Sequence, residues 1–136
     1  MSPRWTRGAK DAVGTAYSTA SRVWYTLAAG ILTEVYFPTI DTPQVRDLQL
    51  LVTDGATFFH DERRNTRSAI ECLDEASLGF EIVNVAENDL YTIRKTVIGA
   101  PHHDCVLMGS NPISPSMRLP SGTHPSTARS LALLTK

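Results

Sequence analysis

Five carboxylates in turns or strand-like segments have the clearest capacity for acid–base chemistry: Glu34, Asp41, Asp47, Asp54 and Glu81. Hydrolysis by an acid and a base needs two carboxyl groups at a fixed separation, roughly 6.5 to 9.5 Å for an inverting mechanism. Aspartates in turns commonly accept hydrogen bonds from nearby backbone amides, which explains Asp41 and Asp54 without catalysis. The other three lie in turns or on strand faces, so we assign no catalytic residue.

The histidines and cysteines give no clear metal site. His102, His103 and Cys105 are close in sequence, but adjacent residues of a strand point to opposite faces, and a closed zinc site needs four ligands. Cys72 and Cys105 are the only cysteines and lack the C-x-x-C spacing of a redox or metal motif. No glycine-rich phosphate loop is present either. We therefore expect no metal and no cofactor.

The elements that position these side chains are predicted to be strands. The runs 22–27 and 31–37 are rich in aromatic and β-branched residues, and Ala28-Ala29-Gly30 between them indicates a hairpin. Pro38, Asp41 and Pro43 interrupt the chain before a strand over 48–53. Asp54-Gly55 then predicts a turn into a short strand over 57–59. Consecutive hairpins of this kind predict an antiparallel sheet.

The rest of the first hundred residues is less uniform. Residues 1–20 are predicted to be an extended lead-in, in which Gly14 has a structural role because glycine allows another strand to approach closely. The segment from residue 60 to residue 79 is charged. The apolar residues in and beside its centre, 63–75, are Ala69, Ile70, Leu73 and Ala76, a spacing that predicts a loop with a short helix. A second hairpin is predicted from strands over 78–86 and 90–98.

Charge and hydropathy exclude two classes of partner. Residues 1–108 carry ten Lys and Arg against fourteen Asp and Glu, a net charge of minus four, and the remaining residues add three positive charges. A nucleic-acid-binding domain has a basic excess, so we expect no nucleic-acid partner. No apolar run approaches the roughly 20 residues of a membrane span. The N-terminus also lacks the apolar stretch of a signal peptide, so export is not expected for the chain as written.

The early strands point to a covered sheet. Neither face of 22–27 or 31–37 is simply polar, whereas a sheet with one face in water alternates cleanly, so we expect a second layer or another domain over these strands. Glu34 is expected to form an ordinary cross-strand ion pair with Arg22 or Arg46, or to point toward a partner domain. The neighbouring aromatic residues are candidates for stacking on sugar rings, although core packing is the favoured interpretation for most of them: Trp24, Tyr25, Tyr36 and Phe37.

A long part of the chain resembles the N-terminal β-domain of prokaryotic glycoside hydrolase family 15, the glucoamylases and glucodextranases. The resemblance covers roughly the first hundred residues. It rests on the segments Val13-Gly14-Thr15-Ala16, Ser21-Arg22-Val23-Trp24, Gly30-Ile31-Leu32, Glu34-Val35-Tyr36, Pro38 with Asp41, and Arg46-Asp47-Leu48 with Thr53-Asp54-Gly55.

The resemblance implies an all-β fold, an antiparallel sandwich that forms part of a supersandwich of the galactose-mutarotase type. It also implies a parent enzyme, a glucan 1,4-alpha-glucosidase or glucodextranase, that cleaves terminal α-glucosidic bonds of glucans with inversion. The family carries its catalytic glutamates in an (α/α)6 barrel after the β-domain, and this chain has no matching positions. The implied partners are that barrel and an α-glucan. The candidate domain-interface or sugar-contact residues are Arg22, Trp24, Glu34, Tyr36 and Arg46.

The resemblance stops after Met108. Residues 109–136 contain six serines, four prolines and no acidic or aromatic residue, which predicts a disordered C-terminal tail with one helical turn near 128–134. The predicted division is therefore a partial β-domain over 1–108 and a tail over 109–136. A truncated or frame-shifted gene and a native linker both explain the change. The alternatives to an enzyme fragment are a stand-alone carbohydrate-binding or protein-interaction β-module and a non-functional remnant. Family members are often periplasmic or secreted, so the compartment stays open.

Overall fold

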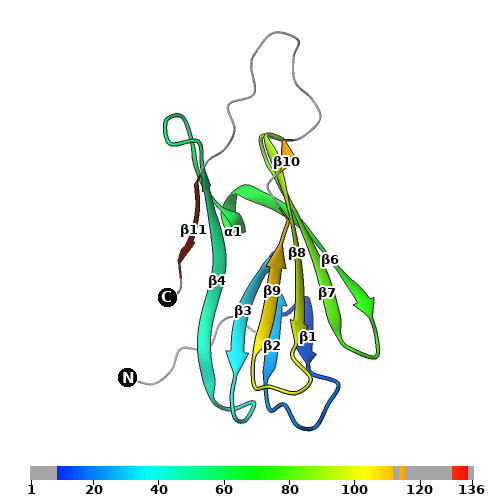
Figure 1. Cartoon of the computed structure of the whole chain (residues 1–136). Coiled ribbons are helices and arrows are strands. Elements are labelled where there is room, and N and C mark those ends of the chain that lie inside the picture. The colour runs from blue at the N-terminus through cyan, green and yellow to red at the C-terminus, as the bar shows by residue number, and fades with distance from the viewer. Residues whose placement is uncertain (1–8, 112–113, 116–129, 135–136) are drawn as a thin grey trace.

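A computed structural model describes residues 9–111, 114–115 and 130–134, most of which lie in strands (Figure 1). Its elements are β1 (Ala12–Thr15), β2 (Trp24–Ala28), β3 (Ile31–Tyr36), β4 (Pro43–Thr53), β5 (Phe59–Asp61), α1 (Glu62–Asn65), β6 (Thr66–Asp74), β7 (Gly79–Ala86), β8 (Tyr91–Gly99), β9 (Val106–Ser110), β10 (Ser114–Pro115) and β11 (Ser130–Leu134).

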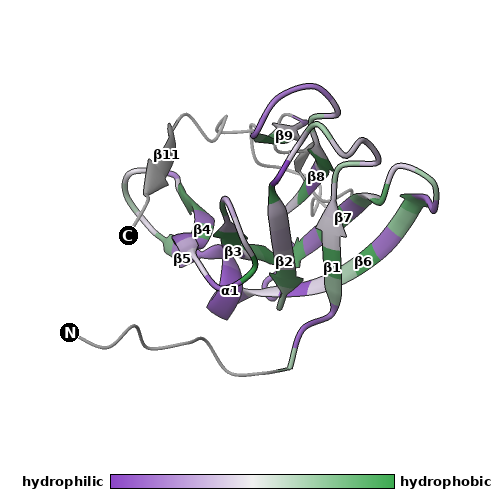
Figure 2. Cartoon of the chain, turned by 90° about the horizontal axis from the view of Figure 1, so that it is seen from below, coloured by the Kyte–Doolittle hydropathy of each residue, from purple (hydrophilic) through white to green (hydrophobic). Residues whose placement is uncertain are grey.

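These strands form two sheets. The six-stranded sheet has the order β1-β2-β3-β4-β11, with β5 also paired to β4. The five-stranded sheet has the order β10-β8-β7-β6, with β9 also paired to β8. Figure 2 shows β2 and β3 on one side of the interior and β8 and β9 on the other. The pairings among the described strands are antiparallel, which confirms the predicted all-β sandwich.

The core fills the space between the two sheets. Because side chains alternate along a strand, one set from each strand faces the opposite sheet. One buried cluster comprises Tyr25, Leu27, Leu32, Phe80, Ile82 and Val97. A second comprises Leu50, Val52, Ala86, Tyr91 and Ile93, with Phe58 packed against it. The hydroxyl of Tyr25 donates to the carbonyl of Leu78 at 2.7 Å, so this ring also joins the two sheets.

The three predicted hairpins are present. β2 pairs with β3 across Ala29 and Gly30, both of which have positive φ, and β7 pairs with β8. β4 pairs with β5 after the turn at Asp54-Gly55, but β5 spans Phe59–Asp61, two residues later than the strand predicted over 57–59. Asp54 Oδ1 accepts hydrogen bonds from the backbone amides of Ala56, Thr57 and Phe58 at 2.8 to 3.1 Å. These contacts confirm the turn role of this carboxylate.

Gly14 has the predicted structural role, but its segment is more ordered than expected. Residues 12–15 form β1, in which Gly14 lies opposite Tyr25. A Cβ on Gly14 would overlap the end of the Tyr25 ring, so glycine is needed for close packing at this point. The prediction of an extended lead-in over residues 1–20 was therefore wrong for β1. A four-residue strand is too short to show a clear period of two.

Two other strand predictions were wrong. The loop with a short helix expected over 63–75 is a nine-residue strand, β6, and only the single turn α1 precedes it. β6 is the last strand of its sheet and is largely exposed on both faces, so it shows no alternation of apolar and polar residues. β4 begins at Pro43 rather than at Leu48. Its first residues are exposed, so no buried apolar pattern revealed them.

The tail prediction is only partly within the described residues. β9 continues through Ser110, two residues beyond the predicted division at residue 108, and 114–115 pair with β8. Residues 130–134 pair with β4 as a strand, so the helical turn expected near 128–134 was wrong. The disorder predicted for the remaining positions falls on 112–113, 116–129 and 135–136, which lie outside the described residues. The division at 108 stays a prediction.

Candidate functional site

Four of the five candidate domain-interface or sugar-contact residues lie together on one face of the six-stranded sheet. Trp24 on β2 lies opposite Tyr36 on β3, and Glu34 on β3 lies opposite Arg46 on β4. The alternate residue Tyr25 points into the core, so this set faces away from it. We call this surface of β2, β3 and β4 the outer face. Register therefore places residues from three strands on one side of the sheet.

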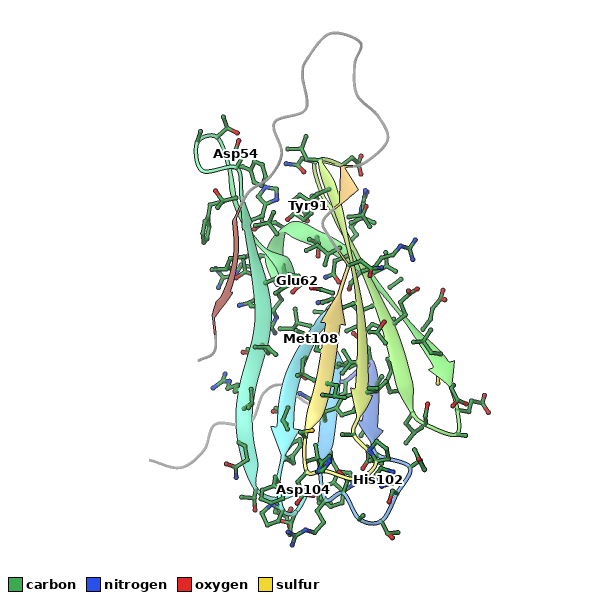
Figure 3. The ribbon with its side chains drawn as sticks, viewed as in Figure 1. Asp54, Glu62, Tyr91, His102, Asp104 and Met108 are labelled. Carbon is green, nitrogen blue, oxygen red and sulfur yellow. The ribbon has the colours of Figure 1, made fainter. Side chains whose placement is uncertain are left out.

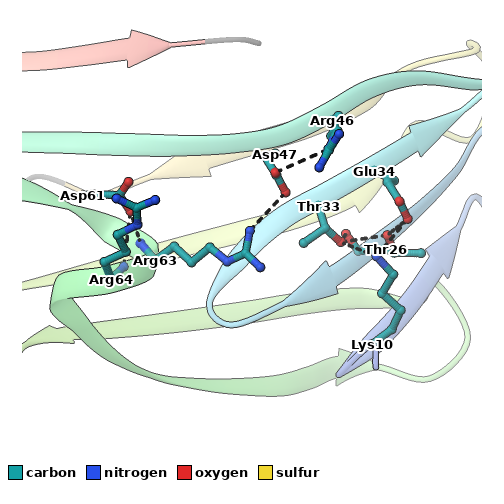
Figure 4. A network of polar contacts seen from close by, with 9 residues as sticks. All are labelled: Lys10, Thr26, Thr33, Glu34, Arg46, Asp47, Asp61, Arg63 and Arg64. Atoms are coloured by element: carbon teal, nitrogen blue, oxygen red, sulfur yellow. Dashed lines mark hydrogen bonds and ion pairs between the residues drawn. The ribbon is translucent and has the colours of Figure 1, made fainter. Parts of the chain in front are cut away.

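Glu34 is the centre of a buried polar cluster on the outer face. Its carboxylate pairs with Lys10 Nζ at 2.9 Å and accepts hydrogen bonds from Tyr36 Oη at 2.6 Å and Thr26 Oγ1 at 3.2 Å. Thr33 lies beside Thr26, their hydroxyl oxygens 2.8 Å apart (Figure 4). Glu34 is only 4% exposed although it faces away from the sandwich core. The cluster is therefore held in a fixed arrangement.

The partner of Glu34 differs from both expected partners. Lys10 precedes β1 and is 24 positions away in sequence, so no local pattern links it to Glu34. Arg46 instead lies beside Asp47, with Nε 3.7 Å from Oδ2. Arg22 lies two residues before β2. Its Nη2 is 3.6 Å from Asp104 Oδ2, and its guanidinium carbon lies over the Phe37 ring, 5.3 Å from the ring centroid. The expectation that Glu34 pairs with one of these arginines was wrong.

The aromatic residues near Glu34 are mostly not available as sugar platforms. Tyr25 is fully buried in the core, and Tyr36 is buried with its hydroxyl on Glu34. Trp24 and Phe37 are half-buried, and Phe37 is covered on one side by Arg22. The expectation of core packing is confirmed for Tyr25, whereas Trp24 is half-buried on the outer face.

A buried ion pair between the sheets was missed by sequence reasoning. Lys95 on β8 and Glu62 on α1 form a direct ion pair, and their side chains are 1% and 0% exposed. Lys95 Nζ also donates to the carbonyl of Gly30 at 2.7 Å, and Glu62 accepts from the Leu50 amide at 2.9 Å. Burial raises the pKa of Glu62 and lowers that of Lys95, and the attraction within the pair opposes both shifts. This pair has a structural role, since it connects β8 to α1, to β4 and to the turn between β2 and β3.

The other residues considered for chemistry are far apart. Figure 3 shows Asp54 at one end of the sandwich and His102 and Asp104 at the other. Cys72 and Cys105 are exposed thiols on β6 and beside β9. Among the residues that the structure describes, no three His, Cys, Asp or Glu side chains gather as a metal site would require. The described part of the chain also holds no helix long and apolar enough to cross a membrane.

Buried tyrosines should make the protein sensitive to alkali. Burial raises the pKa of Tyr25, Tyr36 and Tyr91 from 10.0 to about 12, and the Glu34 carboxylate adds to the effect at Tyr36. The folded state therefore holds these protons more tightly than the unfolded state. Their contribution to the free energy of unfolding is complete below pH 10 and is lost as pH rises toward 12. Urea unfolding across this range should show a falling midpoint, and a constant midpoint would contradict the assignment.

The fold and the comparisons now define the class of this protein. Two facing antiparallel sheets make it a β-sandwich domain. Residues 1–112 match the family model described as "Glucodextranase, domain N". The chain therefore belongs to the glucodextranase N-domain family, which confirms the resemblance found in its sequence.

Two relatives agree with this assignment. The chain is 39% identical over 104 residues to a glucoamylase of Clostridium sp. (strain G0005), an alignment that covers 76% of this chain and 15% of the relative. It is also similar to the crystal structure of a bacterial glucoamylase complexed with acarbose, with a TM-score of 0.78, 35% identity and coverage of 85% of this chain and 17% of the other. The chain thus spans about a sixth of the glucoamylases it matches and is homologous to their N-terminal domain.

Proposed function

We propose that this chain acts as the N-terminal accessory domain of a glucoamylase-type glycoside hydrolase that cleaves terminal α-glucosidic bonds of glucans with inversion. The observation that carries the proposal is the family match over residues 1–112, joined by 39% identity to a glucoamylase. In this proposal the catalytic carboxylates belong to an (α/α)6 barrel outside this chain. The domain itself supports the barrel and is inactive alone.

The outer face is the proposed contact surface for the barrel. Trp24 offers a half-buried ring, and Arg46 offers a guanidinium whose side chain is 55% exposed. Glu34 and Tyr36 lie in the fixed cluster between them. Arg22, held by Asp104 just before the start of β2, extends the same surface. An aromatic ring and arginines around a fixed polar centre are typical of protein interfaces.

The carboxylate of Glu34 is poorly suited to catalysis. It is held by an ammonium group and two hydroxyl groups in a buried setting. A general acid must release its proton to the substrate, and a general base must reach a water molecule. A carboxylate that is already committed to three neighbours is better suited to holding β2, β3 and Lys10 together.

A domain exchange tests the proposal. Residues 1–112 would replace the matching segment of the Clostridium glucoamylase, and glucose release from maltooligosaccharides would be measured for the chimera and for this chain alone. We expect an active chimera and no release by the chain alone. Trp24→Ala and Arg46→Ala in the chimera should reduce its thermal stability or activity more than Arg94→Ala, whose side chain lies on the exposed face of the other sheet.

Two results would contradict the proposal. Glucose release by residues 1–136 alone would mean that the chain has its own active site. A folded but inactive chimera, together with maltooligosaccharide binding by the chain alone, would favour the stand-alone carbohydrate-binding module.

A further inference from the structure

An open cavity of about 910 Å³ lies beside the candidate residues of the outer face. It is bordered by β4, by the end of β5 and by α1, and Figure 4 shows several of its side chains next to the Glu34 cluster. Its lining residues among those described are Arg46, Asp47, Gln49, Leu51, Asp61, Arg63 and Arg64. The lining is thus polar and contains three arginines against two aspartates.

The two aspartates of the lining do not satisfy the hydrogen-bond donors of the arginine side chains. Asp61 Oδ1 accepts from the backbone amides of Arg63 at 2.9 Å and Arg64 at 3.2 Å, so this atom serves the backbone. Asp47 lies 3.7 Å from Arg46 Nε and 3.6 Å from Arg63 Nη1. Both distances exceed the usual length of a hydrogen bond. Within the described chain the guanidinium of Arg64 has no ion-pair partner. The cavity therefore offers an excess of cationic hydrogen-bond donors.

Two of the lining residues also have a side-chain oxygen that lacks a hydrogen bond and has almost no accessible surface. Asp47 Oδ1 and Gln49 Oε1 are buried atoms without a hydrogen-bond partner. A buried polar atom left in this condition costs free energy, so its presence calls for an explanation. Asp47 also has a φ of 54°, a left-handed conformation that is uncommon outside glycine and is found at functional positions. Asp47 Oδ1 lies 3.6 Å from Arg63 Nη1, so a ligand that fits must supply acceptors to the arginines.

We infer that this cavity docks an acidic peptide segment of a partner domain, with a Glu or Asp carboxylate on the arginines. Arginine forms bidentate, charge-assisted hydrogen bonds to a carboxylate, and an acidic segment of a partner domain carries such carboxylates. A sugar fits less well because no aromatic ring lines the cavity among the described residues.

The inference rests on the proposed function, in which the partner is the catalytic barrel. The cavity adjoins Arg46, a residue that belongs both to this lining and to the proposed contact surface. Arginines of this domain would therefore anchor that surface by binding an acidic side chain of the catalytic barrel.

A peptide-binding experiment tests the cavity directly. The probe is an N-acetylated, C-amidated peptide of alternating Gly and Glu, titrated into the full chain at low ionic strength and followed by NMR shifts of backbone amides and arginine Nε–H groups. We expect shifts at 46–49 and 61–64. Arg64→Gln and Arg46→Gln should each weaken binding about tenfold, because each removes a charge-assisted contact. Arg67→Gln, which changes an exposed arginine on β6 that pairs with Asp89, should leave binding unchanged.

A matched peptide of Gly and Gln gives the second comparison and should bind at least tenfold more weakly, the loss expected when the anion is removed. Equal binding of the two peptides, an equal loss in Arg67→Gln and Arg64→Gln, or the same shifts with maltose would overturn the inference. The readout is binding alone, so it is separate from the glucose release of the chimera. An inactive chimera with intact peptide binding would reject the proposed function, and an active chimera without peptide binding would reject only the cavity.

Discussion

Lys95→Met is expected to lower the free energy of unfolding by about 3 to 5 kcal/mol, the cost of breaking a buried ion pair by removing one partner. The variant leaves the Glu62 carboxylate buried without its cation and leaves the Gly30 carbonyl without its donor. The size of methionine is close to that of the lysine stem, so the loss reports on charge rather than on a cavity. Urea unfolding followed by circular dichroism measures it.

The deficit of Lys95→Met should depend on pH. Burial raises the pKa of Glu62, and the Lys95 ammonium opposes that shift in the wild type. Without the ammonium the folded-state pKa rises further above the unfolded value of about 4.5, so the folded variant binds the proton more tightly. Its free energy of unfolding should therefore increase as pH falls from neutrality toward that value, and its deficit should shrink. A deficit that is independent of pH would show that removing the ammonium does not raise the folded-state pKa of Glu62.

Two further variants define the origin of the effect. The double variant Lys95→Met with Glu62→Gln should recover most of the lost stability at neutral pH, since an uncharged amide can still accept from the Leu50 amide. Arg94→Met is the matched control, because it removes the neighbouring cation on the exposed face, 3.3 Å from Glu81. Surface ion pairs contribute about 0.2 to 1 kcal/mol. A loss in Arg94→Met as large as that in Lys95→Met would contradict the assigned importance of burial.

Gly99→Ala is expected to lower the free energy of unfolding by about 1 to 3 kcal/mol, the usual cost of overpacking a core. A Cβ at this position would lie 2.7 Å from the Ala16 amide nitrogen and 2.9 Å from the Thr15 carbonyl carbon. Both contacts are with backbone, which cannot move aside as a flexible side chain can. β8 would have to separate from the segment that follows β1. Thermal or urea unfolding measures the change.

Gly109→Ala is the control for this substitution. Gly109 lies on β9, has no positive φ, and has open space around the position of an added Cβ. Replacing such a glycine in a strand should leave stability unchanged or raise it slightly, because the unfolded chain loses conformational freedom. Equal effects of the two substitutions would show that the close approach at Gly99 does not limit the packing of the sandwich.

The local parts of this fold were determined by the sequence alone. The hairpins at Gly30, at Asp54-Gly55 and after Ala86 follow from turn residues between runs of strand-forming residues, which are signals within a few positions of each other. The family was also recognisable, since its motifs are contiguous segments. Lys95 gave a further local signal, because it lies on the same face of β8 as the buried residues Tyr91, Ile93 and Val97. That alternation predicts a buried lysine, and a buried lysine needs a partner.

The partners of these side chains were decided only by the tertiary structure. Glu62 meets Lys95 across 33 positions and Glu34 meets Lys10 across 24, and these pairings depend on which strands and turns are neighbours in space. β6 is a strand because its backbone pairs with β7, although its exposed side chains show no pattern. The arginine cavity likewise joins β4 to α1. Periodicity reports which face of an element is buried, whereas contacts between distant elements follow from the sheet order and register of the whole chain.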